Sequence, residues 1–204
     1  MTISTEFLVT ALVVALVPGT GVIYTVSHGL FGGRRPSALA AVGCTLGIVP
    51  HLVAATLGLS ALVHTSARVF QVMKLAGVAY LLYLAWGMWR STGSLAIQKP
   101  TGARSDRAIV VRGTVVNLLN PKLTIFFFAF LPQFVDAGSP STAALALLGA
   151  VFMVVTLVVF LAYGLVASTV RERVVGSPTV VRRLQRGLAV AFAGLGLRLA
   201  FEDR

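Results

Sequence analysis

The chain has 204 residues, of which 57% are hydrophobic and only 11% charged, and its mean hydropathy is +0.90. Soluble domains carry about a quarter charged residues, because polar groups must cover much of a folded surface. A net charge of +11 would suggest a nucleic-acid partner in a soluble protein, but here the basic residues lie between long apolar runs. The composition therefore predicts an all-α integral membrane protein in a lipid bilayer, with no nucleic-acid partner.

Six helical spans are predicted, because a helix needs about 20 apolar residues to cross the hydrocarbon core. They cover residues 7–30, 37–63, 69–89, 109–134, 141–170 and 187–200. A short loop at 31–36 and a polar linker at 91–108 separate the first two and the middle two spans. The prediction is a single membrane domain over 1–204, with one three-helix half at 1–90 and the other at 109–204. A cleaved signal peptide is disfavoured, because no basic residue precedes the first apolar run and Glu6 is acidic.

Basic residues are divided unequally between the two sides of this arrangement. Twelve fall on one side: Arg34, Arg35, Arg90, Lys99, Arg104, Arg107, Arg112, Arg171, Arg173, Arg182, Arg183 and Arg186. Four fall on the other: Arg68, Lys74, Arg198 and Arg204. Because short basic loops stay in the cytoplasm, both the N- and the C-terminus are predicted to face away from it.

The two halves have the same layout. Each begins with a span that contains a proline, Pro18 in the first half and Pro121 in the second, and the two prolines lie 103 residues apart. Three spans per half place the second half upside down relative to the first. Such inverted repeats, with broken helices that meet at the substrate site, are typical of secondary transporters. Prolines are also frequent in membrane helices generally, so a coincidence is the alternative.

The segment Pro18-Gly19-Thr20-Gly21 interrupts the first span. A proline removes one backbone donor, and the carbonyls that it frees must find other partners inside a membrane. The helix that starts after the break presents free N–H groups, which suit a carboxylate. The segment therefore predicts one half of a binding site, and a simple packing kink is the alternative.

Asn117, Asn120, Pro121 and Lys122 form the strongest site signal. The two asparagines are three residues apart and share a helix face. A lysine at membrane depth is costly and usually functional, so Lys122 is predicted to bind a substrate carboxylate or freed backbone carbonyls. The alternative is a lysine that extends to the cytoplasmic surface.

Gly43, Gly47 and His51 are spaced by four and share one helix face. The glycines permit close helix packing, within one bundle or between two copies in a homodimer. His51 should therefore face a neighbouring helix, as a structural residue or as a proton carrier. No His, Cys or acidic cluster has metal-ligand spacing, and no catalytic triad or phosphate-binding loop is present. We therefore expect no enzyme activity, no metal and no cofactor.

The sequence resembles the LysE/RhtB-type amino-acid exporters of bacteria over nearly its whole length. The resemblance rests on residues 17–19 (V-P-G), the glycine and histidine pattern at 43–51, 74–81 (K-L-A-G-V-A-Y-L), 117–122 (N-L-L-N-P-K), 130–135 (F-L-P-Q-F-V) and 194–200 (G-L-G-L-R-L-A). The family often has Pro-Gly-Pro where this chain has Pro18-Gly19-Thr20. That difference leaves one more backbone donor at the break.

The resemblance implies a bacterial inner-membrane exporter of amino acids or related small metabolites, driven by the proton gradient. The expected site lies between the broken first and fourth helices. Backbone N–H groups after Pro18 and the Lys122 ammonium would hold the carboxylate, and Asn117 and Asn120 would orient it. His51 would carry protons.

Two other functions stay open. One is export of another solute, such as a metal ion or a toxic analogue, although the spans lack the carboxylates and paired thiolates that metals prefer. The other is a membrane scaffold or assembly protein, which predicts polar residues on a lipid-facing seam instead of in the bundle interior.

Overall fold

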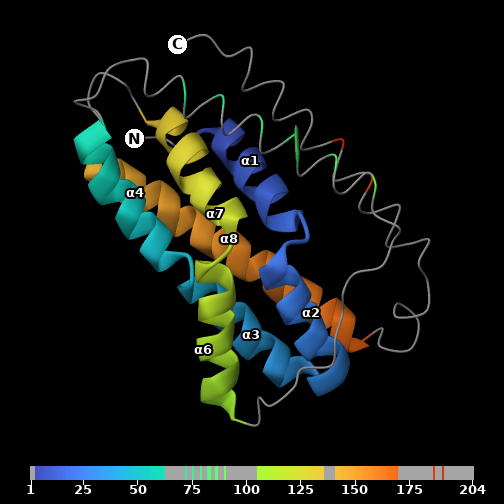
Figure 1. Cartoon of the computed structure of the whole chain (residues 1–204). Helices are drawn as coiled ribbons and strands as arrows, with labels where there is room; N and C mark the ends of the chain where they lie inside the picture. The colour runs from blue at the N-terminus through green and yellow to red at the C-terminus, as the bar shows by residue number, and fades with distance from the viewer. Residues whose placement is uncertain are drawn as a thin grey trace.

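The computed structural model describes residues 3–62, 105–135 and 141–169, together with single positions between 72 and 90 and at 186 and 190. Every regular element in these stretches is helical (Figure 1). The predicted all-α class is therefore confirmed. The predicted spans 69–89 and 187–200 fall almost entirely outside the described stretches, so the six-span count and the single domain over 1–204 stay predictions.

The first predicted span is built from two helices, α1 (Thr5–Leu16) and α2 (Thr20–Gly32). The helices meet at an angle of 56°. The bend follows from Pro18, whose ring nitrogen cannot donate a hydrogen bond to the carbonyl of Val14 one turn earlier. Gly19 then starts α2 with an extended backbone, at φ −113° and ψ −169°. The predicted break in the first span is confirmed.

The second predicted span is built from α3 (Arg34–Leu46) and α4 (Val49–Leu62). The 25 residues Arg34–Gly58 form one helical stretch long and apolar enough to cross a membrane. The predicted loop at 31–36 is wrong, because α2 and α3 are separated by Gly33 alone. Gly33 has a φ of +89°, a left-handed conformation that glycine adopts readily, and this lets the chain turn within one residue.

The fourth predicted span is also broken. Its elements are α6 (Asp106–Leu118), α7 (Pro121–Ile125), the π-helical η1 (Phe126–Phe130) and the 3-10 helix η2 (Leu131–Phe134). The parts before and after the break meet at 53°. The irregular turns before Pro132 free backbone carbonyls, and the buried Gln133 side chain donates to one of them, the Ala129 carbonyl, at 2.7 Å. The predicted break at Pro121 is confirmed, and the helix starts at Asp106, three residues before the predicted boundary.

The fifth predicted span, 141–170, is confirmed as one unbroken helix, α8 (Thr142–Thr169). Its 28 residues extend over about 42 Å at the usual helical rise, more than the roughly 30 Å of a hydrocarbon core. The helix is therefore long enough to cross the hydrocarbon core with some tilt or to extend into the headgroup region. In Figure 1 it crosses obliquely past the other helices, and it packs against α1, α2, α3 and α4.

The two broken spans run in opposite directions. Figure 1 shows α1 and α7 together in the upper part of the molecule, and α2 and α6 in the lower part. The chain thus descends through α1 and α2 and ascends through α6 and α7. An exposed ion pair between Arg35 and Asp106 joins the start of α3 to the start of α6 at the lower end.

The apolar core divides into two clusters that meet near the breaks. The larger gathers residues of α1, α4, η1 and α8 around Phe7, Phe127 and Phe152. The smaller gathers residues of α1, α2, α3 and α8 around Val22, Cys44 and Phe160. Buried polar side chains also occur elsewhere, but Asn117, Asn120 and Lys122 gather at the α6–α7 break.

Candidate functional site

The break between α6 and α7 is capped by its own sequence. The Asn120 side-chain oxygen accepts a hydrogen bond from the Lys122 backbone N–H at 3.1 Å, so Asn120 is the N-cap of α7. Pro121 occupies the first helical position, where a missing N–H costs nothing. Asn120, Pro121 and Lys122 therefore supply the N-cap, the first helical residue and the capped N–H of α7.

A chain of amide hydrogen bonds fixes this break to α3. The Asn120 Nδ2 donates to Asn117 Oδ1 at 3.0 Å, and Asn117 Nδ2 donates to the Cys44 carbonyl at 2.7 Å. Both asparagines are buried. Their amides are thus engaged in the protein itself, and their direct role here is to hold the second break in position.

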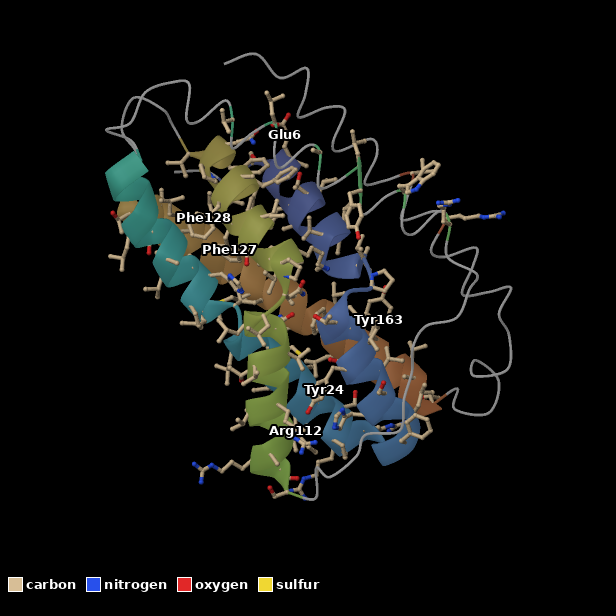
Figure 2. All side chains as sticks on the ribbon, in the orientation of Figure 1. Glu6, Tyr24, Arg112, Phe127, Phe128 and Tyr163 are labelled. Atoms are coloured by element: carbon tan, nitrogen blue, oxygen red, sulfur yellow. The ribbon has the colours of Figure 1, made fainter. Side chains whose placement is uncertain are left out.

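The break between α1 and α2 is capped by side chains from distant segments. Lys122 Nζ donates to the Val14 carbonyl and to the Val17 carbonyl, each at 3.0 Å. Val14 carries the carbonyl that Pro18 leaves without its helical partner. The Tyr163 hydroxyl of α8 donates to the Leu16 carbonyl at 2.6 Å. Figure 2 shows Tyr163 at the height of the junction between α1 and α2.

Lys122 is the cation at this crossing. Its side chain is 9% exposed, and its Nζ lies 3.4 Å from the position that a Cβ on Gly19 would take. The alternative in which Lys122 extends to the cytoplasmic surface is therefore wrong, since the ammonium ends in the interior against the opposite break. A positive charge at the C-terminal carbonyls of α1 is also favourable for the helix dipole.

Thr20 lies less centrally than the other predicted site residues. Its side chain is exposed, and its hydroxyl lies 3.5 Å from the Val116 carbonyl of α6. Pro18 and Gly19 are half-buried beside Lys122. The structure thus brings together six of the seven predicted substrate residues and turns the seventh toward α6.

The helix face that carries Gly43 and Gly47 packs against α6, and the two glycines meet successive turns of that helix. A Cβ on Gly43 would lie 2.4 Å from the Val110 carbonyl, and one on Gly47 would lie 2.5 Å from the Thr114 carbonyl. The predicted role of these glycines in close helix approach is therefore confirmed within this bundle.

His51 follows on the same face and is buried, as predicted, against a neighbouring helix. Its Nε2 lies 3.4 Å from the Asn117 carbonyl, and its Nδ1 lies 3.4 Å from the Thr124 hydroxyl. Both contacts are long, so they hold the ring only weakly. His51 is thereby linked through Asn117 to the same hydrogen-bonded group as Lys122.

Two residues at the site, Tyr163 and Cys44, were not predicted from the sequence. They contribute through contacts that join distant segments, and no local pattern signals them. Gly21 lies within the predicted Pro18 to Gly21 segment, which gave it no individual role. A Cβ on Gly21 would meet Asn117 Oδ1 at 2.8 Å and the Phe160 ring at 2.8 Å. Its position three residues after a proline was the available signal.

The polar residues converge in the interior, which opposes a scaffold whose polar groups face lipid. The first N–H groups of α2 have no acceptor within their own helix, and the Lys122 ammonium lies beside that helix start. Together they form a locally positive environment suited to an anionic group. Within residues 3–62, 105–135 and 141–169, no group of three His, Cys, Asp or Glu side chains could hold a metal ion.

Comparison with known proteins gives a consistent result. An uncharacterized membrane protein of Vibrio cholerae is 32% identical over 194 residues, which cover 95% of this chain and 94% of the relative. A homoserine/homoserine lactone efflux protein of Salmonella typhi is 30% identical with the same coverage. A leucine efflux protein of Enterobacter sp. is 26% identical over 95% of this chain and 93% of its own length. No solved structure matches the chain.

The family comparison covers more of the sequence than the described structure does. The LysE type translocator family matches residues 12–203, so the match includes both breaks and the spans predicted at 69–89 and 187–200. The chain belongs to the LysE type translocator family of membrane transport proteins.

Proposed function

We propose that this protein exports amino acids or related small metabolites across the bacterial inner membrane. Support comes from family membership and from relatives named for efflux of homoserine, homoserine lactone and leucine. The observation that carries the proposal is the contact of Lys122 with the opposite break, where its Nζ is 3.0 Å from the Val14 and Val17 carbonyls. A single buried ammonium beside a helix start is suited to a carboxylate.

The substrate carboxylate binds to the Lys122 ammonium and to the free N–H groups at the start of α2. The ammonium exchanges its two carbonyl partners for the carboxylate when substrate enters. Gly19 leaves the space beside the ammonium open, because it has no side chain. Asn117, Asn120 and Pro121 act by holding the α6–α7 break against α3, and Thr20 contributes its N–H to the start of α2.

Transport follows from movement of one half against the other about this crossing. The exposed Arg35–Asp106 pair joins an element of each predicted half, so opening the lower end requires the pair to separate. Exposed pairs of this kind contribute only about 0–1 kcal/mol, which makes separation easy. In the proposed arrangement the chain has two inverted three-helix halves, both termini lie outside the cytoplasm, and two copies form a homodimer.

The proton gradient drives export, with His51 as the proton carrier. Histidine titrates near neutral pH, and His51 is linked to the Lys122 group through the Asn117 carbonyl. In inside-out vesicles a protonophore should abolish accumulation of substrate in the wild type. The variant His51→Gln should equilibrate substrate without accumulating it. Accumulation that persists in His51→Gln removes His51 from coupling.

The decisive experiment measures amino acids in the medium of cells with and without the protein. Expression should raise the external concentration of at least one amino acid, and Lys122→Ala should abolish the increase while still inserting in the membrane. Undiminished efflux from cells producing Lys122→Ala overturns the role of Lys122. If the wild type releases no amino acid, the proposed function is overturned.

A matched variant separates binding from folding. A Cβ on Gly19 has no neighbour nearer than 3.4 Å, so Gly19→Ala fits the fold, yet it puts a methyl group beside the Lys122 ammonium. We expect normal stability and export reduced by roughly tenfold, which corresponds to about 1.4 kcal/mol of lost binding. Gly58→Ala, whose Cβ would lie 3.6 Å from Phe128, is the control.

The topology is tested by a reporter fused after Arg204 that is active only in the cytoplasm. It should be inactive in cells. An active reporter reverses the proposed orientation.

A further inference from the structure

A threonine of α8 has a buried hydroxyl without a hydrogen-bond partner among the described residues. Thr156 is 2% exposed, and its Oγ1 has no hydrogen-bond partner in the part of the chain that the structure describes. Buried hydroxyls in helices usually bond the carbonyl one turn earlier. Thr25 and Thr45 do so here, donating to Gly21 and Ala41 at 2.9 Å. Thr156 therefore departs from the local rule at a position hidden from lipid and water.

The neighbours of Thr156 on α8 define its location. Phe152, one turn before, stacks on Phe126 of η1 with ring centroids 4.3 Å apart. Phe160, one turn after, lies 2.8 Å from the position that a Cβ on Gly21 of α2 would take. Residues four apart share a helix face, so Thr156 lies on the α8 face between these two contacts. Each contact is with the segment that follows a break.

The substrate provides a group that this hydroxyl can bind. An amino acid carries an α-ammonium as well as a carboxylate, and the ammonium needs acceptors. The acidic residues of the chain are Glu6, Asp106, Asp136, Glu172, Glu202 and Asp203, and the sequence places all of them at the ends of the predicted spans or outside them. Neutral oxygen atoms must therefore accept from the ammonium. The amide oxygens of Asn117 and Asn120 are already hydrogen-bonded within the protein.

Resting on the function proposed above, we propose that Thr156 Oγ1 accepts a hydrogen bond from the substrate α-ammonium while Lys122 holds the carboxylate. Thr156 thus distinguishes amino acids from simple carboxylic acids. The hydroxyl stays without a protein partner because the substrate is its partner.

The test compares each amino acid with its analogue lacking the amino group. The probes are L-homoserine with 4-hydroxybutanoate and L-leucine with 4-methylpentanoate, measured as competitors of labelled amino-acid uptake into inside-out vesicles. The wild type should prefer the amino acid. In Thr156→Val, which keeps the side-chain shape, this preference should fall roughly tenfold, because a hydrogen bond to a charged group is lost. Thr156→Ser should keep the preference.

The control is Thr45→Val, which removes a buried hydroxyl already bonded within its own helix. It should leave the preference unchanged. If Thr156→Val is not recovered from membranes, Thr156→Ala replaces it with the same expected loss. An unchanged preference, or equal weakening of both members of a pair, overturns the assignment of Thr156 while leaving amino-acid export intact. A wild type that takes up no amino acid at all overturns the export proposal and this inference together.

Discussion

The two breaks arise from the same residue type but are stabilised in different ways. At the α6–α7 break, Asn120 caps the new helix from within three residues. At the α1–α2 break, Gly19 offers no side-chain cap, and the freed carbonyls are bonded by Lys122 and Tyr163 from distant segments. The first break is therefore capped by a residue of the second break, Lys122, whereas the second break is capped by its own Asn120. The binding site proposed at the first break could therefore open while the cap of the second break stays formed.

The largest expected effect comes from removing the link between the breaks. Lys122→Met leaves the Val14 and Val17 carbonyls without donors in a dry interior. We expect it to abolish export and to lower the free energy of unfolding by about 2–3 kcal/mol, the value of hydrogen bonds to a charged group. Chemical denaturation of the purified protein in detergent measures the second quantity. Wild-type stability in this variant would mean that the first break does not need Lys122.

A slightly smaller effect is expected from forcing the breaks apart. Gly21→Ala places a methyl group 2.8 Å from Asn117 Oδ1 and from the Phe160 ring, so one of them must move. Overpacking of this kind costs about 1–3 kcal/mol. We expect a lower melting temperature and weaker export. Equal melting temperatures for Gly21→Ala and the control Gly58→Ala would contradict the close approach of α2 and α6.

The Asn120 N-cap of α7 should contribute less to stability than the hydrogen bonds of Lys122 to the first break. Asn120→Ala removes the N-cap of α7 and the hydrogen bond to Asn117, for about 1 kcal/mol. Asn120→Ser restores a capping oxygen and should recover most of that loss. Urea or guanidinium unfolding of the two variants separates capping from the amide chain. If Ser is no better than Ala, the N-cap is not what stabilises this break.

The smallest effect is expected at the second donor of the first break. Tyr163→Phe removes one neutral hydrogen bond, to the Leu16 carbonyl, and keeps the ring in place. The expected cost is about 0.5–1.5 kcal/mol of stability, with export retained. This variant also serves as a control for Lys122→Met, since both uncap the same helix end. Export lost in Tyr163→Phe would show that any uncapped carbonyl at this break stops transport.

Much of the fold follows from local chemistry, and the errors have local causes as well. The breaks at Pro18 and Pro121 are predictable because a proline cannot donate a backbone hydrogen bond. The predicted loop at 31–36 is wrong because Arg34 and Arg35 form the first turn of α3. The residue that makes the turn is Gly33, through its left-handed backbone.

The sequence by itself determined the membrane setting, the two breaks, the packing of Gly43 and Gly47, and the family. Each of these depends on composition, on proline chemistry or on helical spacing. Only the tertiary structure decided that Lys122 bonds the carbonyls of Val14 and Val17, more than a hundred residues earlier. A long flexible side chain can reach many partners from one position. Which partner it takes depends on how the two broken spans cross, and no local pattern encodes that crossing.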